Sequence, residues 1–209
     1  MVKQYGFHIN TAQCGNCKAC QIACKDKNDL PVGMLFRRVW QYGGGNWVKQ
    51  GDFMVPNGVF NYGVSVACMH CEKAPCVEVC PSGAMTKRPD GIVVVNQDQC
   101  IGCRYCEWAC PYGAPQFDER KGVMAKCDFC QDLLAKGENP SCVDQCPMRA
   151  IEFGELSELR AKYGNIAGVE PLPDPAITSP SVVITMHRHA QESGKVPPQP
   201  DRNRRNHLR

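Results

Sequence analysis

The cysteines carry the most specific chemistry in this chain, because all sixteen fall into four groups of four. The groups are Cys14, Cys17, Cys20 and Cys24; Cys68, Cys71, Cys76 and Cys80; Cys100, Cys103, Cys106 and Cys110; and Cys127, Cys130, Cys142 and Cys146. A [4Fe–4S] cluster is held by four thiolates, and three cysteines at two-residue intervals followed by a fourth before proline are a known ligand pattern. The sequence therefore predicts four [4Fe–4S] clusters and an electron-carrying chain.

Disulfides and zinc are two other uses of so many cysteines. Disulfide scaffolds of this cysteine density are small secreted domains, and this chain begins Met1-Val2-Lys3-Gln4 without a secretory signal. Zinc sites normally take two separated cysteine pairs, often with histidine.

Among the histidines, His70 alone lies inside a cysteine group. We expect it to form a hydrogen bond near a cluster and not to bind iron, because the thiolates already complete the ligand count.

The fourth cysteine of a group is expected to bind a different cluster from the first three. Cysteines spaced by two residues lie on one tight loop, so their thiolates converge on one cluster. Proline after Cys80, Cys110 and Cys146 disfavours a helical conformation at the cysteine, which turns its side chain away from its own loop. In two-cluster ferredoxins the fourth cysteine ligates the other cluster. We therefore expect the groups to work in reciprocal pairs.

The connections between the groups indicate which of them are paired. A short predicted hairpin, residues 85–88 and 92–95 around the turn Pro89-Asp90-Gly91, joins the two middle groups into one unit. The outer groups are then left to pair with each other. The four predicted ligand sets are site 1, Cys14, Cys17, Cys20 and Cys146; site 2, Cys24, Cys127, Cys130 and Cys142; site 3, Cys68, Cys71, Cys76 and Cys110; and site 4, Cys80, Cys100, Cys103 and Cys106.

An α+β fold of short elements is expected around these sites, because regular apolar periodicity is scarce and clusters must replace much of the core. We expect two ferredoxin-like units of the bacterial 2×[4Fe–4S] type. The outer unit comprises residues 1–32 and 120–165, and the inner unit comprises residues 55–119. An aromatic and glycine-rich hairpin is inserted at 33–54, and 166–209 form an extended, partner-wrapping arm with a basic tail. Strands are predicted at 5–9, 59–66, 92–95, 122–126 and 150–153, and helices after Cys17, after Cys103 and at 155–163.

The roles of the inserted hairpin and of the arm stay open at this stage. The hairpin either covers a cluster of its own chain or faces a partner. The proline-rich arm either moves freely or wraps a neighbour. From His187 onward the net charge is +4 with histidine neutral, against +3 for the whole chain. This tail is either solvated or contacts a partner or an anionic membrane surface, whereas nucleic-acid binding fits poorly because no recognised motif is present.

Several kinds of catalytic and membrane-spanning motif are missing from the sequence. No stretch approaches the roughly 18 apolar residues of a membrane span, and neither a Rossmann fingerprint nor a phosphate-binding loop is present. All sixteen thiolates are needed to complete the four clusters. We therefore expect an electron carrier that performs no substrate chemistry.

The order of the four groups resembles the four-cluster iron–sulfur subunits of the molybdopterin oxidoreductase family, over nearly the whole chain to about residue 185. The segments that resemble the dimethyl sulfoxide reductase branch of that family most are Gln4-Tyr5-Gly6-Phe7, Phe36-Arg37-Arg38, Cys80-Pro81-Ser82-Gly83-Ala84-Met85, Cys100-Ile101-Gly102-Cys103-Arg104-Tyr105-Cys106 and Cys110-Pro111-Tyr112-Gly113-Ala114-Pro115-Gln116. Subunits for thiosulfate, polysulfide, arsenate or formate share the cysteine plan.

The resemblance implies an assembly of three parts. A catalytic subunit carries a molybdopterin cofactor, this chain carries the clusters, and an integral membrane anchor oxidises quinol. Site 1 would face the catalytic subunit and site 4 the anchor. Taken alone, the chain start predicts a cytoplasmic protein, whereas the resemblance implies export to the periplasmic face of the inner membrane with a signal-bearing partner. The alternative from a different class is a free soluble polyferredoxin.

Overall fold

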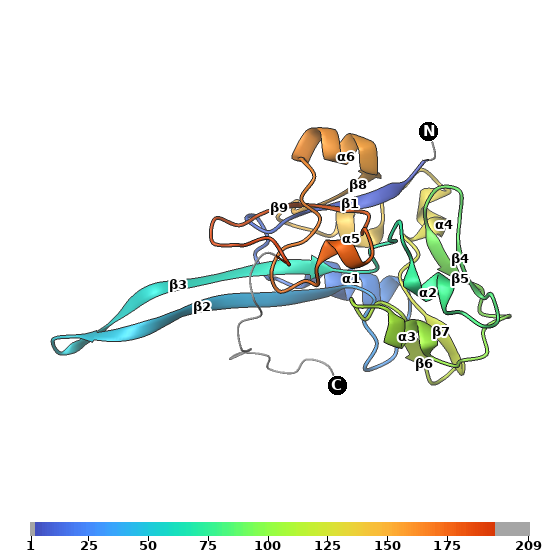
Figure 1. Cartoon of the computed structure of the whole chain (residues 1–209), viewed down its shortest axis with the longest axis horizontal. Coiled ribbons are helices and arrows are strands. Elements are labelled where there is room, and N and C mark those ends of the chain that lie inside the picture. Colours follow the sequence, from blue (N-terminus) through green and yellow to red (C-terminus); the bar gives the residue numbers. More distant parts are fainter. Residues whose placement is uncertain (1–2, 195–209) are drawn as a thin grey trace.

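Residues 3–194 are described here from a computed structural model, in which short strands and helices form a body and one long two-stranded ribbon projects from it (Figure 1). The mixture of helices with small sheets confirms the α+β class. The elements in chain order are β1 (Tyr5–Asn10), α1 (Ala19–Lys27), β2 (Arg38–Gln50), β3 (Phe53–Val66), α2 (Pro75–Glu78), β4 (Met85–Lys87), β5 (Val93–Val95), α3 (Tyr105–Ala109), β6 (Gln116–Asp118), β7 (Val123–Ala125), α4 (Gln131–Leu134), α5 (Ser141–Asp144), β8 (Ile151–Glu155), α6 (Leu156–Tyr163), the 3₁₀ helix η1 (Pro175–Ile177) and β9 (Val182–Thr185).

Strand β1 is the middle strand of a three-stranded sheet. It pairs antiparallel with β8 and parallel with β9, and Phe7 lies opposite both Phe153 and Val182. Helix α6 packs on this sheet, where Leu156 and Leu159 form an apolar cluster with residues of β9 (Figure 1). The strands predicted at 5–9 and 150–153 and the helix predicted at 155–163 are therefore confirmed within two residues at each end. The sheet holds the first and last cysteine groups in one body.

The C-terminal segment differs from the extended arm expected for residues 166–209. Residues 166–185 return to the body, because β9 joins the central sheet and Val169 and Leu172 are buried. The hydroxyl of Tyr62 also donates a hydrogen bond to the Glu170 carbonyl oxygen at 2.6 Å. This part of the segment therefore covers its own chain, since its apolar side chains find a sheet edge there. The basic tail from residue 195 onward lies outside the described residues.

The ribbon of β2 and β3 is longer than the hairpin expected at 33–54. Its strands pair antiparallel from Arg38 opposite Val66 to Gln50 opposite Phe53, with an irregularity at Gly45. Gly45 has a φ of +91°, and a Cβ atom there would overlap the backbone of Gly58, so this position requires glycine. The base of β3 is buried, whereas the tip stands away from the body (Figure 1). The ribbon thus takes in residues expected in the inner unit, and its tip covers no part of its own body.

Two small hairpins flank the third cysteine group. Strands β4 and β5 pair from Met85 opposite Val95 to Lys87 opposite Val93, as the Pro-Asp-Gly turn predicts. Strands β6 and β7 form the second hairpin, which includes the strand predicted at 122–126. The short helices α2 and α5 were not predicted from the sequence. Each ends just before the last cysteine of its group, and the Cys-Pro element follows.

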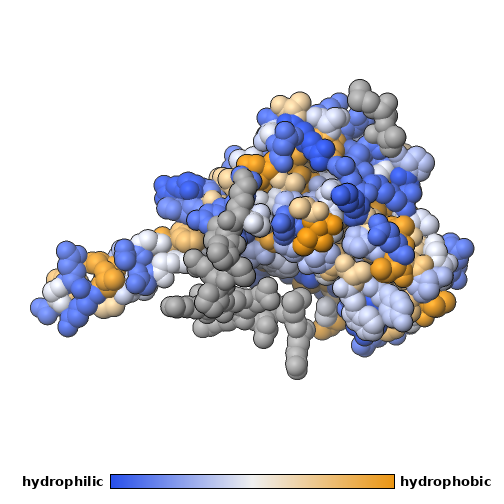
Figure 2. Space-filling model, in the orientation of Figure 1, coloured by the Kyte–Doolittle hydropathy of each residue, from blue (hydrophilic) through white to orange (hydrophobic). Residues whose placement is uncertain are grey.

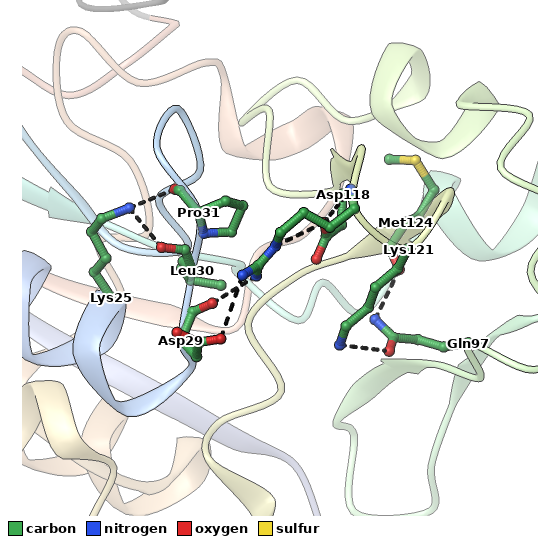
Figure 3. Close-up of polar contacts among 9 residues, drawn as sticks. Lys25, Asp29, Leu30, Pro31, Gln97, Asp118, Lys121 and Met124 are labelled. Carbon is green, nitrogen blue, oxygen red and sulfur yellow. Dashed lines mark hydrogen bonds and ion pairs between the residues drawn. The ribbon is translucent and has the colours of Figure 1, made fainter.

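The loop after Cys24 is tied to the β6–β7 hairpin by charged side chains (Figure 3). The Lys25 ammonium donates hydrogen bonds to the carbonyl oxygens of Leu30 at 2.9 Å and Pro31 at 2.5 Å. Arg120 forms ion pairs with Asp29 at 3.4 Å and Asp118 at 3.5 Å. No proline follows Cys24, so α1 continues through it to Lys27. The first group is therefore closed by a helix and a clamped loop instead of a Cys-Pro turn.

Candidate iron–sulfur cluster sites

The cysteine loops bend through left-handed backbone conformations. Such conformations are uncommon outside glycine and let a short loop curl around a central point. Helices α1, α3 and α4 each start directly after a residue in this conformation: Lys18, Arg104 and Cys130. The residues other than glycine with positive φ inside the four groups are Asn16, Lys18, His70, Arg104, Phe129 and Cys130. The helices therefore begin where the loops have turned their cysteines inward.

The four cysteines of site 4 line one cavity. Cys100, Cys103 and Cys106 come from one loop and α3, whereas Cys80 comes from the preceding group. The cavity is closed by apolar side chains that include Met85, Val95, Ile101 and Met124. Backbone N–H groups donate to two of the sulfur atoms, from Met85 to Cys80 at 3.4 Å and from Met124 to Cys100 at 3.3 Å.

A second cavity is lined by the four cysteines of site 3. Cys68, Cys71 and Cys76 come from one group, and Cys110 comes from the next group along the chain. The Ala114 N–H donates to the Cys110 sulfur at 3.5 Å. Each of these two cavities is therefore lined by three cysteines of one group and the last cysteine of the other, while ligation of a cluster by these sets stays a prediction.

The cysteines of the outer groups are brought together across more than one hundred residues of chain. At site 1, Cys14 has Cys17, Cys20 and Cys146 as electrostatic neighbours. At site 2, Cys24 has Cys130 and Cys142 as neighbours, and Cys127 has Cys24 and Cys142. Contacts between α1 and α5 hold these loops against each other. The Ala150 N–H donates to the Cys146 sulfur at 3.3 Å, which repeats the contact at Cys110.

The surroundings of these sulfur atoms fit an iron–sulfur cluster. Burial raises the pKa of Cys24, Cys71 and Cys76 to about 12, so thiolates there need a positive partner. Iron supplies that charge in a cluster bound by cysteine. No three potential ligands converge on a point that suits a single metal ion among residues 3–194. The cysteines of sites 3 and 4 instead surround apolar cavities and accept backbone hydrogen bonds.

We describe the four sites as a row in the order 1, 2, 3, 4, because each site has cysteines close to those of the next site. Cys20 of site 1 is an electrostatic neighbour of Cys142 of site 2, and Cys127 of site 2 is a neighbour of Cys68 of site 3. Sites 3 and 4 meet in an apolar cluster that contains Cys76, Cys106, Met85, Val93 and Met124. Each site therefore has a neighbouring site, and the arrangement suits transfer of electrons along the row.

His70 is fully buried and lines the site 3 cavity. Its Nδ1 accepts a hydrogen bond from the Val93 N–H at 3.0 Å, which agrees with the hydrogen-bonding role expected from the sequence. The ring stacks on Phe129 with 3.8 Å between the ring centroids.

Sequence reasoning missed the role of two buried cations next to the sites, Arg37 and Lys126. Arg37 stands out in the sequence only through the family resemblance. The Lys126 ammonium donates hydrogen bonds to the carbonyl oxygens of Val93 and Cys127. A buried charge is costly without a partner of opposite sign. The sequence feature that could have identified these two residues is that each cation lies within a short apolar or cysteine-containing segment.

The fold and the cysteine sites together define a ferredoxin-like iron–sulfur protein. A family model described as a 4Fe-4S dicluster domain matches residues 59–156. The B subunit of the anaerobic dimethyl sulfoxide reductase of Escherichia coli (strain K12) is 50% identical over 194 residues, which cover 93% of this chain and 94% of that protein.

Two further relatives carry the names of other reductases. The B subunit of the polysulfide reductase of Wolinella succinogenes is 40% identical, with 82% of this chain and 86% of the relative covered. A thiosulfate reductase electron transfer subunit of Salmonella typhi is 41% identical, with 76% of this chain and 79% of the relative covered. The present chain belongs to this family of iron–sulfur electron-transfer subunits, within which it is similar to the B subunit of dimethyl sulfoxide reductase. Within residues 3–194, no helix has the length and apolar character needed to cross a membrane.

Proposed function

We propose that this chain carries one [4Fe–4S] cluster at each of the four sites and relays electrons between two partner subunits. Each bound cluster supplies a one-electron carrier. The cysteines would act as ligands in the sets defined above, and the last cysteine of each group would serve the paired group. The observation that carries this proposal is the crossed lining of two cavities, in which Cys80 joins the third group and Cys110 joins the second.

Two ferredoxin-like units organise the sites in this proposal. The outer unit, residues 1–32 and 120–165, holds sites 1 and 2, and its halves are joined by the pairing of β1 with β8. The inner unit holds sites 3 and 4 around the β4–β5 hairpin. The ribbon of β2 and β3 leaves the body between the first two cysteine groups. Its exposed tip and the region beyond β9 are the parts that we assign to partner contact.

The partners that we propose are a molybdopterin-containing catalytic subunit beside site 1 and a quinol-oxidising membrane anchor beside site 4. The names of the relatives, which are subunits of dimethyl sulfoxide, polysulfide and thiosulfate reductases, support a multi-subunit reductase. The 50% identity favours dimethyl sulfoxide or a related S- or N-oxide as the terminal substrate. Thiosulfate, polysulfide, arsenate or formate chemistry at the catalytic partner is the alternative.

The chain itself is proposed to perform no substrate chemistry, since its cysteines are used as cluster ligands. We propose that it is held at the periplasmic face of the inner membrane by its partners, after export with a signal-bearing subunit. The alternative is the cytoplasmic face. Protease treatment of spheroplasts distinguishes them, because a periplasmic chain is digested before the inner membrane is lysed and a cytoplasmic chain is protected.

Purification from native membranes in mild detergent tests the assignment. We expect the chain to copurify with a molybdenum-containing subunit and an integral membrane protein. Anaerobic analysis of that complex, corrected for the partners' own iron, should give about 16 iron atoms and as many sulfides for this chain. Recovery of the chain as a monomer without partners would indicate a soluble polyferredoxin instead. Iron for only two fully occupied clusters would contradict the assignment of four sites.

A further inference from the structure

Arg37 is the most deeply buried charged side chain among the described residues, with 1% of its surface exposed. Its Nη1 donates to the backbone oxygen of Ser65 at 3.3 Å and to the hydroxyl of Ser65 at 3.0 Å. Within residues 3–194, the buried Nε and Nη2 groups have no hydrogen-bond partner. The guanidinium also lies over the ring of Phe7, 4.4 Å from its centroid. Two of its three nitrogen groups therefore point into the interior without an acceptor.

No carboxylate balances this charge within residues 3–194. None of the ion pairs there includes Arg37. Asp118 is the only buried acid of that part of the chain, and its ion-pair partner is Arg120. A guanidinium stays protonated in proteins, and a buried charge without a partner is strongly destabilising. The position of Arg37 thus requires a negative group that carboxylate side chains do not supply.

Cysteines of two sites lie close enough to the guanidinium to interact with its charge. Its electrostatic partners are Cys20 of site 1 and three cysteines of site 2, namely Cys24, Cys127 and Cys142. The hydroxyl of Ser65 links the guanidinium to site 1, because its Oγ lies 3.4 Å from the Cys20 sulfur.

We infer that Arg37 is a shared counter-ion that raises the reduction potentials of the clusters at sites 1 and 2. This inference rests on the proposed function, which assigns a cluster to each site. An oxidised [4Fe–4S] cluster with four thiolates carries a charge of about −2, and reduction adds one more negative charge. A fixed positive charge stabilises the reduced form more than the oxidised form. Arg37 therefore acts through the two clusters: its charge favours their reduced forms at the junction of the two outer sites.

Two other cations near the cysteines, Lys126 and Arg38, differ from Arg37 in their contacts. The Lys126 ammonium is bound by two carbonyl oxygens and faces Cys76 of site 3. Arg38 donates to the carbonyl oxygens of Tyr112 at 2.8 Å and Gly113 at 2.9 Å, and it faces Cys110 of site 3. The two adjacent arginines therefore lie near different sites, and a change at residue 37 is expected to affect sites 1 and 2 more than sites 3 and 4.

Redox titration of the intact complex, followed by electron paramagnetic resonance, tests this inference. The variants are Arg37→Gln, which removes the charge, and Arg37→Lys, which keeps it. Arg160→Gln is the control for net charge, because Arg160 lies on the surface in an ion pair with Glu72. Signals are assigned to sites with one Cys→Ser variant at each site, and iron is measured in every sample.

In Arg37→Gln we expect the ratio of reduced to oxidised cluster at sites 1 and 2 to fall at least tenfold at a fixed ambient potential. For a one-electron couple this corresponds to a shift of about 59 mV. Arg37→Lys should stay close to the unmodified protein at all four sites, and sites 3 and 4 should shift much less than sites 1 and 2 in Arg37→Gln. Unchanged potentials at sites 1 and 2 in an iron-replete Arg37→Gln complex, or an equal shift at all four sites, overturn the inference.

If Arg37→Gln loses the clusters of sites 1 and 2, the iron content of Arg37→Lys shows whether the charge or the packing of residue 37 is needed. Retention of iron in Arg37→Lys supports a requirement for the charge, whereas loss of iron there as well assigns a packing role to Arg37 and overturns the inference. Absence of clusters at sites 1 and 2 in the unmodified complex would instead contradict the proposed function. The iron content of the unmodified protein therefore distinguishes a failure of the counter-ion inference from a failure of the proposed function.

Discussion

Gly63 of β3 lies directly against the sulfur of Cys14, although the two residues belong to different parts of the fold. A Cβ atom at residue 63 would lie 3.0 Å from the Cys14 Sγ and would overlap the side-chain oxygen of Asn16. The base of the ribbon therefore forms one wall of site 1. Glycine is favoured here by the close approach of two segments and not by its backbone angles, because its φ is not positive.

The first prediction follows from that contact. Gly63→Ala should displace the Cys14 loop and weaken or remove the cluster signal of site 1, while the signals of sites 3 and 4 stay normal. Gly154→Ala is the matched control, because a Cβ atom there would meet Leu159 at an ordinary 3.7 Å. Electron paramagnetic resonance of the reduced complex measures both variants. A normal site 1 signal in Gly63→Ala at full iron content contradicts the assignment of Cys14.

The second prediction tests the crossed ligand sets. Cys110→Ser should damage site 3, because Cys110 lines the cavity of Cys68, Cys71 and Cys76. Ligation within one group would instead place the damage at site 4. Redox titration of Cys110→Ser is compared with Cys68→Ser and Cys100→Ser, which mark the two sites. A spectrum that reproduces the loss seen in Cys100→Ser rules out the crossed arrangement.

The third prediction concerns the end of the row at site 4. Cys103→Ser removes one thiolate and should convert that cluster to a three-iron centre of higher potential, since potential depends on cluster type and net charge. A one-electron couple changes tenfold per about 59 mV, so a rise of a few hundred millivolts would hold electrons at this site.

Two activities of the Cys103→Ser complex distinguish electrons held at site 4 from general damage to the complex. Quinol-linked reduction should be nearly lost, whereas reduction driven by a dye that feeds the catalytic subunit directly should continue. The subunits should also still copurify. Normal quinol-linked turnover in a variant shown to contain the three-iron centre would refute an electron path through site 4.

The fourth prediction concerns the dependence of stability on pH at His8. His8 is buried in β1, its Nε2 lies 2.9 Å from the Thr185 hydroxyl, and its ring stacks on Tyr163. Burial lowers the pKa of His8 below its usual 6.5, and Lys162 adds to this, while Glu152 opposes it. The neutral form is therefore favoured in the folded chain. The contribution of His8 to folding stability is fully present above the pKa that His8 has in the unfolded chain. This contribution is lost as the pH falls below that value.

Hydrogen exchange of the amides in β1 and β9 within the complex measures this effect. Between about pH 7.5 and pH 5.5, protection should fall more in the unmodified protein than in His8→Gln. One proton limits the difference in slope to about 1.4 kcal/mol per pH unit. Parallel pH profiles of the two proteins would show that protonation of His8 does not affect the sheet.

The fifth prediction concerns the tip of the ribbon, where Trp47, Phe53 and Met54 are more than half exposed. Figure 2 shows apolar surface among polar residues at this projecting end. Exposed apolar groups of this kind mark contact surfaces. Trp47→Ser and Phe53→Ser should change the stability of the chain by no more than about 0.5 kcal/mol but should weaken its retention in the complex.

Pull-down of the partners at increasing salt and detergent measures that retention. Val32→Ser is the control, because Val32 is also an exposed apolar residue but lies on the body of the molecule. Complexes of Trp47→Ser and Phe53→Ser that are as stable as the Val32→Ser complex would mean that the tip faces solvent.

The cysteine loops and several elements could be predicted from the sequence because local spacing specifies them. Cysteines two residues apart share a loop whatever the rest of the chain does. The β4–β5 hairpin follows from Pro89-Asp90-Gly91, since a turn depends on the residues that form it. The helix α6 and its end at Gly164 have a similar local origin. These predictions needed no knowledge of distant contacts.

The length of the ribbon and the position of the C-terminal segment could not be predicted in this way. The tip of the ribbon lacks regular apolar alternation, because neither of its faces is buried by other residues of the described range 3–194. Strand β9 contains three apolar residues followed by Thr185, after a proline-rich stretch, and only the edge of β1 makes it a strand. Pairing between segments this far apart is decided by burial, which local pattern does not encode.

The sequence by itself determined that the chain binds iron–sulfur clusters, because the number and spacing of thiolates are set along the backbone. The tertiary structure alone decided which charges and walls surround each site. Arg37 meets cysteines of two sites, Gly63 meets Cys14, and Cys127 lies beside Cys68. The physical reason is that electrostatic and steric effects depend on distance in space, and folding brings these residues together across dozens of positions in the chain.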